Sequence, residues 1–307
     1  MDMKRLLSIT LLALLLPVPA LWAQGAEALP FTQVERDPVN AALAGAGSAY
    51  AGSAAVKAFS GAALLPFAEG KLDASLGYRH WASDRSHQAD AAVAFRVTPA
   101  LVLGAGYSFS AGQSYDWLGE YGQYLETIRP VSHLFTLAAG LGLGEQWSVG
   151  VNLRYAVAKA DGRQSGFSGD VSAAWQPLSS LRLMAAVATV GTAVVSEDGT
   201  RYNQPAHAKV GADWTWALAQ DHTLDMMASA DVFFSGHAGG ALGVQYSWKD
   251  MVFVRAGGRL ASAGCVVPSH VGMGVGVRLH GFRLDVSYLT ASKALGNTLS
   301  VGLGYSF

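Results

Sequence analysis

Residues capable of chemistry are scattered through this sequence and do not form a recognisable site. The eight histidines show no repeated ligand spacing, and neither a G-x-S-x-G nucleophile motif nor an H-E-x-x-H zinc motif occurs. Cys265 is the only cysteine, which excludes an intrachain disulfide and a metal site built from several thiolates. We therefore expect a protein that is not an enzyme and uses no cofactor or metal.

Two sets of glycines could be mistaken for phosphate-binding loops. One comprises Gly140, Gly142 and Gly144, and the other follows the same spacing from residue 272 to residue 276. A phosphate loop lies between a strand and the start of a helix, whereas these glycines recur at every second residue with no helical pattern after them. They predict instead a strand face without side chains, against which another backbone segment can pack.

Composition limits the classes of protein that fit. The 307 residues carry a formal net charge of -1, with 14% charged and 51% hydrophobic residues, so nothing favours nucleic-acid binding. Beyond the N-terminus, no apolar run approaches the roughly 20 residues that a membrane-spanning helix needs. The apolar surplus must therefore be distributed among strands.

A strict two-residue alternation runs through most of the chain. Residues 147–158 place Trp147, Val149 and Val151 on one face and Ser148 and Asn152 on the other, and residues 297–307 end the chain in the same way. Because this pattern recurs far beyond what one soluble core could absorb, we predict an all-β transmembrane antiparallel barrel. About fourteen strands are expected, at residues 71–81, 86–97, 100–111, 131–143, 147–158, 167–176, 181–190, 206–217, 222–234, 239–248, 251–261, 269–279, 282–291 and 297–307.

The connections between these strands alternate in length. Short turns are expected on the periplasmic side of a bacterial barrel and longer loops outside. This predicts an outer-membrane protein with both termini in the periplasm. The short connections are residues 98–99, 144–146, 177–180, 218–221, 249–250 and 280–281, and the longer ones are residues 112–130, 159–166, 191–205 and 262–268.

The chain is expected to comprise three parts. Residues 1–23 have the pattern of a secretory signal peptide, with Lys4 and Arg5 before an apolar run and Ala23 at the cleavage point. Residues 24–70 are rich in Ala and Gly and poor in charge, so we expect them to fold inside the barrel as a plug; a periplasmic arm is the alternative. Residues 71–307 form the predicted barrel.

The same alternation turns a set of charged side chains toward the lumen. Buried charges are retained chiefly when they are paired, so mutual pairing and contact with the plug are favoured over solute binding. The predicted lumen network comprises Arg79, Arg96, Arg154, Asp170, Arg182, Asp213, Asp225, Asp231, Arg255, Arg259, Arg278, Arg283 and Asp285.

The N-terminal segment resembles a known family. The Leu29-Pro30-Phe31 start, the Arg36-Asp37-Pro38 step and the Ala/Gly run at residues 41–47 are similar to the N-terminus of PorV/PorQ-type outer-membrane proteins of Bacteroidota. This resemblance, within the FadL-like superfamily, implies a fourteen-stranded barrel with an N-terminal segment in the lumen. Some members serve the type IX secretion system, and the FadL branch passes hydrophobic solutes.

Two functions are considered. The first is an outer-membrane protein associated with type IX protein secretion, with secretion-system proteins or secreted cargo as partners besides outer-membrane lipid. Its expected contact surface is the outer loops, chiefly residues 112–130 and 191–205. In the first loop, Tyr115, Trp117, Tyr121 and Tyr124 are anchors of the kind that dominate interfaces; a loop that only lies over the pore mouth is the alternative.

The alternative is a FadL-like channel for hydrophobic or amphipathic small molecules, with the plug as its gate. It requires an apolar lumen. The inward residues of the predicted strands are mostly Gly, Ser, Arg and Asp, with Met184, Met227 and Phe233 as exceptions.

Overall fold

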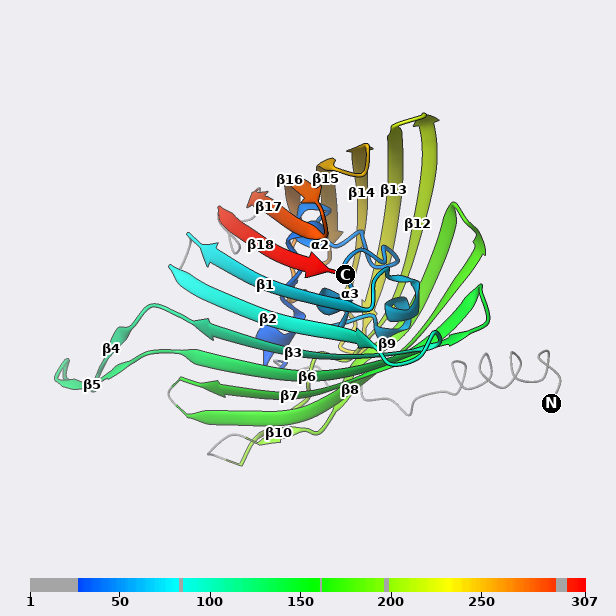
Figure 1. Cartoon of the computed structure of the whole chain (residues 1–307). Coiled ribbons are helices and arrows are strands. Elements are labelled where there is room, and N and C mark those ends of the chain that lie inside the picture. The colour runs from blue at the N-terminus through cyan, green and yellow to red at the C-terminus, as the bar shows by residue number, and fades with distance from the viewer. Residues whose placement is uncertain (1–26, 83–84, 161, 196–198, 291–296) are drawn as a thin grey trace, which may run out of the picture.

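Within the described residues, fourteen antiparallel strands form one closed barrel (Figure 1), which confirms the predicted fold class. The computed structural model describes residues 27–82, 85–160, 162–195, 199–290 and 297–307, so the expected signal peptide lies outside it. The barrel strands are β1 (Leu72–Trp81), β2 (Ser86–Arg96), β3 (Leu101–Ala111), β6 (Val131–Leu143), β7 (Trp147–Lys159), β8 (Arg163–Leu178), β9 (Leu181–Gly191), β12 (His207–Ala219), β13 (His222–Phe233), β14 (Ala238–Trp248), β15 (Val252–Ala261), β16 (His270–Leu279), β17 (Phe282–Thr290) and β18 (Thr298–Ser306).

Each barrel strand pairs with the next one along the chain, and the last returns to the first. In this closing pair, Asp73 of β1 lies opposite Ser306 of β18, and Gly77 lies opposite Gly302. A closed ladder leaves no strand edge with unpaired N–H and C=O groups, which is the condition for strands to cross a bilayer.

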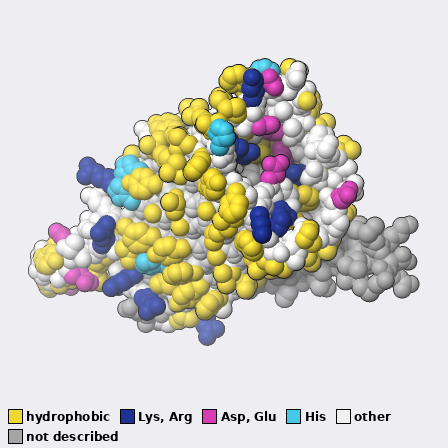
Figure 2. Space-filling view, in the orientation of Figure 1, with side chains coloured by type: hydrophobic (Ala, Val, Ile, Leu, Met, Phe, Trp, Pro, Cys, Tyr) yellow, Lys and Arg dark blue, Asp and Glu magenta, His cyan; other side chains and the backbone are white. Residues whose placement is uncertain are grey.

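Side chains alternate between the two faces of the wall as the sequence predicts. Val151 of β7 is 46% exposed on the outside, whereas the adjacent Asn152 is completely buried on the inside. Figure 2 shows that hydrophobic side chains cover much of the outer face visible in that view. This apolar outer surface is the kind that lipid stabilises.

Connections of different length lie at opposite ends of the barrel, but one loop is shorter than predicted. β8 begins at Arg163 instead of residue 167, because Ser165 and Gly166 continue the pairing with β7. The two longest loops contain small hairpins that the sequence analysis did not predict. These are β4 (Tyr115–Leu118) with β5 (Tyr124–Ile128), and β10 (Val194–Val195) with β11 (Arg201–Tyr202).

Residues 27–70, called the lumen segment here, form short helical turns inside the barrel (Figure 1). Asp37 caps α2 by accepting a hydrogen bond from the Val39 amide at 2.9 Å. Gly45 has a φ of 90°, a left-handed conformation that ends this turn region and that glycine adopts without strain. The turns are η1 (Pro30–Gln33), α2 (Pro38–Ala42), α3 (Ala54–Lys57) and η2 (Ala62–Phe67).

The turns of the lumen segment contact different parts of the wall. α2 packs against β15 to β18, α3 packs against β1 to β3, and η2 packs against β3 and β6 to β8. None of the described helices has the length and apolarity needed to cross a membrane.

Candidate functional site

The backbone of the lumen segment lies directly against glycine residues of the barrel wall. A Cβ atom added to Gly257 would meet the backbone of Leu43, and one added to Gly272 would meet the carbonyl oxygens of Ala41 and Ala42. On the other side, Gly150 faces the backbone of residues 62–63 in the same way. Glycine is required at these positions because no side chain fits between wall and segment.

Not every predicted glycine serves this purpose. Gly276 faces the side chains of Arg255 and Asp285, and Gly304 faces the guanidinium group of Arg283. The space above both is filled by charged side chains of neighbouring strands, so the prediction that the glycines at residues 272–276 face a packed backbone segment is wrong for Gly276.

Polar side chains of the wall satisfy backbone groups of the lumen segment. Asn152 donates from Nδ2 to the Ala58 carbonyl oxygen at 2.9 Å, and its Oδ1 accepts from the Ala62 amide at 3.2 Å. Arg154 donates from Nη2 to the Phe59 carbonyl oxygen at 2.8 Å, and Ser172 accepts from the Ala63 amide at 3.1 Å. Buried backbone groups need such partners, so these side chains fix the path of residues 58–63.

Most charges of the predicted lumen network lie close to an opposite charge. Asp225 accepts hydrogen bonds from Gln245 at 2.7 Å and Thr215 at 2.6 Å. Pairing offsets the cost of burying these charges. The ion pairs are Arg154 with Asp170, Arg182 with Asp213 (3.6 Å), Arg255 with Asp285 (2.6 Å), Arg259 with Asp231 (2.7 Å) and Arg283 with Asp73 (2.6 Å).

The other three members of the predicted network have different surroundings. Arg79 donates to Ser300 Oγ at 2.7 Å, and Arg96 donates to the backbone carbonyls of Pro66 and Ala68 near the short-turn end. The guanidinium carbon of Arg278 lies 5.4 Å from the centre of the Phe253 ring. A role in solute binding stays a prediction for the whole set.

Charged residues of the lumen segment itself were missed by the sequence analysis. Arg36 donates to the carbonyl oxygens of Phe31 and Val34 at 3.0 Å and 2.9 Å, and burial lowers the pKa of its guanidinium to about 10. Burial raises the pKa of the Asp37 carboxyl to about 6. The Asp37-Pro38 step could have identified a helix cap, and the expected plug already placed these residues inside the barrel, but no alternation showed which of their side chains would be buried.

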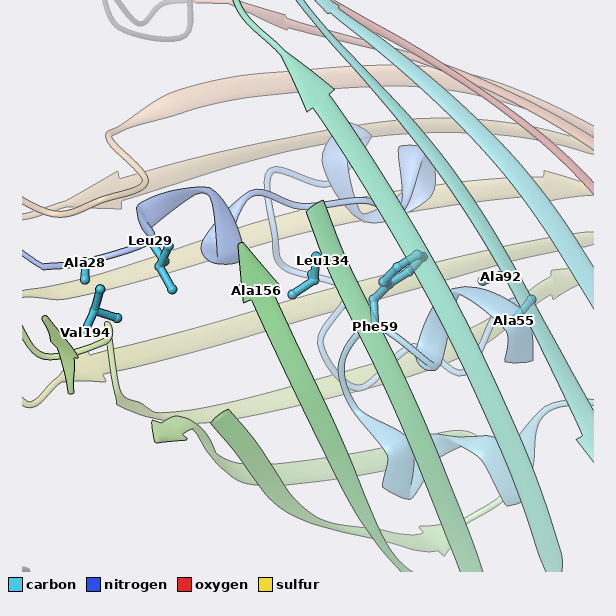
Figure 3. Close-up of a cluster of buried hydrophobic side chains, with 8 residues drawn as sticks. All are labelled: Ala28, Leu29, Ala55, Phe59, Ala92, Leu134, Ala156 and Val194. Carbon is cyan, nitrogen blue, oxygen red and sulfur yellow. The ribbon is translucent and has the colours of Figure 1, made fainter. Parts of the chain in front are cut away.

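A line of buried apolar side chains runs between the lumen segment and the wall (Figure 3). We call it the apolar stripe. Its end near the long loops contains Leu29 and Val194, and its other end contains Ala55 and Ala92, next to Phe59. The predicted apolar residues Met184, Met227 and Phe233 are also buried. The sequence analysis underestimated the apolar character of the interior because several of the contributing side chains belong to the lumen segment. The full set is Ala28, Leu29, Ala55, Phe59, Ala92, Leu134, Ala156 and Val194.

Cavities inside the barrel are small. Those between the lumen segment and the wall have volumes of about 40, 90 and 100 Å³. For comparison, an apolar cavity of about 150 Å³ accommodates benzene. A larger recess of about 630 Å³ opens at the short-turn end, where Phe67, Arg182 and Phe307 line it.

The aromatic residues predicted as outer-loop contacts lie on the hairpin β4–β5. Tyr115, Trp117, Tyr121 and Tyr124 are all exposed, Tyr121 most of all at 90%. Their role as partner contacts stays a prediction. Among the described residues, no group of three or more His, Cys, Asp or Glu side chains could hold a metal ion.

Comparison with known proteins identifies solved structures with a similar fold. No family model and no curated protein matches the sequence. Among solved structures, the Ralstonia pickettii toluene transporter TbuX matches with a TM-score of 0.66 and 12% identity, over 89% of this chain and 98% of that one. The CymD monoaromatic hydrocarbon channel matches with a TM-score of 0.65 and 14% identity, over 92% and 99%.

A third match gives the same picture. A Pseudomonas aeruginosa FadL homologue aligns with a TM-score of 0.57 and 10% identity, over 89% of this chain and 98% of that one. At such identities the likeness concerns the fold alone, which is the barrel architecture of FadL-like outer-membrane proteins. The finer resemblance to PorV/PorQ-type proteins stays a prediction.

Proposed function

We propose that this protein is an outer-membrane channel for hydrophobic or amphipathic small molecules, with the lumen segment as its gate. Likeness in fold to TbuX and CymD over almost their whole length supports the proposal. Both ends of residues 71–307 lie at the short-turn end, where Lys71 N donates to the Phe307 carbonyl oxygen at 2.6 Å. The proposed orientation puts this end in the periplasm.

The apolar stripe is the observation that carries the proposal. Its members are buried and packed against one another, so an apolar solute would contact them only after part of the lumen segment moves, in a lumen that is otherwise rich in ion pairs. The cavities beside the lumen segment are smaller than an aromatic ring requires. Passage must therefore involve displacement of part of this segment.

Association with type IX secretion was the first hypothesis from the sequence. The fold comparisons favour the channel hypothesis, because the neighbours described above are hydrocarbon transporters and a FadL homologue. We therefore retain the secretion hypothesis only as a prediction about the exposed hairpin β4–β5.

A reversible disulfide crosslink between the lumen segment and the wall tests whether movement of this segment is needed for transport. A Cβ added to Gly243 would lie 3.1 Å from the Cβ of Ala46, close to the separation of about 3.5–4.5 Å in disulfides. The variant A46C/G243C is made in a C265S background, which removes the only native cysteine. Uptake of radiolabelled toluene is then measured in cells that lack other hydrocarbon channels.

Oxidation of A46C/G243C should abolish protein-dependent toluene uptake, and reduction should restore it. C265S alone is the matched control and should respond to neither treatment. Equal uptake by the oxidised and reduced double variant, with the crosslink verified by mass spectrometry, would contradict a gating role for the segment.

A further inference from the structure

Three basic residues gather on the outer rim of the barrel at the long-loop end. Lys159 ends β7 and Arg163 begins β8, and the two are directly opposite each other in the ladder. Lys159 is also opposite Val131 of β6, and Arg129 precedes that residue by two positions. All three are exposed, and we call them the basic rim.

The basic rim carries positive charge without a protein partner. Within the described part of the chain, no ion pair or side-chain hydrogen bond involves Arg129, Lys159 or Arg163. Asp161, in the turn between the last two, lies outside the described residues. Like charges directly opposite on one sheet face destabilise it, so an anion bound there would offset the repulsion.

The basic rim faces outward from the wall. Lys159 and Arg163 share the side of their strands with exposed apolar residues such as Val151 and Val171. Figure 2 shows Lys and Arg side chains at the lower left edge of the molecule, where β7 and β8 end in Figure 1. Lys159 and Arg163 therefore border the apolar outer surface and not the lumen.

Aromatic side chains lie directly below the basic rim on the same outer surface. Tyr155 and Phe167 form a pair with ring centres 4.5 Å apart, and Tyr107 and Phe135 form another at 5.0 Å. Tyr107 Oη also lies 2.9 Å from Nδ1 of His133. Aromatic girdles of barrels lie at the level of the lipid head groups, so the cations above them are at the level of the phosphates.

We infer that the basic rim binds the phosphate groups of an anionic glycolipid in the outer leaflet. This inference rests on the proposed outer-membrane location and orientation. Lys159 and Arg163 occupy opposite positions, about 5 Å apart at Cβ, and Arg129 lies beyond the start of the neighbouring strand β6, so the long side chains of all three can reach one phosphorylated head group. Arginine offers paired donors to phosphate, and lysine adds a mobile point charge.

The acyl chains of the same lipid fit the surface below. Val151, Leu153 and Val171 are exposed on the outer face of β7 and β8, between the aromatic pair and the opposite end of the barrel. A lipid anchored by its phosphates therefore places its chains on an apolar surface. A free phosphate ion would gain nothing from this surface, which is why the inference names a lipid.

The test uses the full mature protein in lipid nanodiscs and a titration with bisphosphorylated lipid A, read by native mass spectrometry. The variant R129Q/K159Q/R163Q should bind lipid A about fivefold more weakly per charge removed, from about 1 kcal/mol per basic residue near an anionic surface. Dephosphorylated lipid A should bind wild type and variant equally.

A control distinguishes the basic rim from overall charge. K71Q/K249Q removes two exposed cations at the short-turn end, and should leave lipid A affinity within twofold. Equal losses in both variants, or equal binding of phosphorylated and dephosphorylated lipid A, would overturn the inference. Membrane fractionation of native cells tests the location separately, because nanodisc binding does not depend on it.

Discussion

Glycine is needed on the inner face of the wall for a reason that does not apply on the outer face. Gly257 and Gly258 are neighbours on β15, and they point to opposite sides. A Cβ on Gly257 would enter the backbone of Leu43, whereas a Cβ on Gly258 would meet nothing within 4 Å. The inner face is constrained by volume at each position, and the outer face mainly by apolarity.

This difference follows from what covers each face. Lipid chains are fluid and adapt to any apolar shape, so Val, Leu, Phe and Trp alternate freely along the outside. The lumen segment has one fixed path, held by hydrogen bonds from Asn152, Arg154 and Ser172. Tight packing of this kind tolerates few changes in side-chain volume.

The largest expected effect comes from removing what fills the lumen. Deleting residues 41–61 should convert a nearly closed barrel into one with high ion conductance, because fourteen strands enclose more space than inward side chains can fill. Planar-bilayer recordings of the intact and deleted proteins measure this. High conductance in the intact protein, unchanged by the deletion, would show that the segment does not obstruct the lumen.

On the outer face, a charge should be costly where the wall meets lipid. Val151→Arg places a guanidinium on the exposed side of β7 near mid-membrane, with an expected loss of about 2–4 kcal/mol in folding free energy. Urea titration of refolding into lipid bilayers measures it, with Val151→Ile as the matched apolar control. A loss below 1 kcal/mol for the arginine variant would place Val151 outside the lipid-facing band.

Substitutions of Gly257 and Gly258 compare the tolerance of the inner and outer faces for an added side chain. Gly257→Val should displace the lumen segment near Leu43 at a cost of about 1–3 kcal/mol, the range for overpacked interiors. Gly258→Val should have little effect. Limited proteolysis of residues 27–70 in detergent micelles gives the readout, and equal protection in both variants would remove the proposed distinction between the two faces.

The smallest expected effect depends on pH. Burial raises the pKa of Asp37 from its ordinary value of 3.8 to about 6, so the docked segment binds more protons than a released one between these values. Docking should therefore weaken as pH rises from 4 to 6, by linkage.

Asp37→Asn isolates this contribution because asparagine retains the helix cap without titrating. Protease protection of the lumen segment should fall from pH 4 to pH 6 in wild type, and this fall should be smaller in the variant. The same fall in both proteins would assign the pH dependence to other groups.

Alternation alone predicted the wall to within a few residues at most strand ends, because lipid and lumen impose a strict period of two. The inward charges that it predicted are mostly buried and lie beside an opposite charge, and their role stays a prediction. Asp73 shares the parity of Arg79 and could have been included in the network, since both are buried on β1. The two-residue alternation therefore contained the information needed to predict that Asp73 faces the lumen.

The lumen segment could not be predicted in the same way. Its turns are only four to six residues long, so no periodicity assigns Glu35, Arg36 or Lys57 to a face. Specific ion pairs, such as Arg255 with Asp285, depend on the register between strands, which the sequence does not specify. The hairpin β4–β5 is too short for its alternation to be distinguished from a loop.

The carboxylate of Asp73 has a consequence for how the protein assembles. It accepts hydrogen bonds from Ser53 Oγ at 3.0 Å and the Ala54 amide at 3.3 Å in the lumen segment, and from Arg283 of β17 at 2.6 and 2.8 Å. Its own strand, β1, forms the closing pair with β18. One side chain thus joins the first strand, a late strand and the segment enclosed by them. Closure of the wall and docking of its contents therefore complete the bonds of the same carboxylate, and we expect the two events to be coupled during assembly.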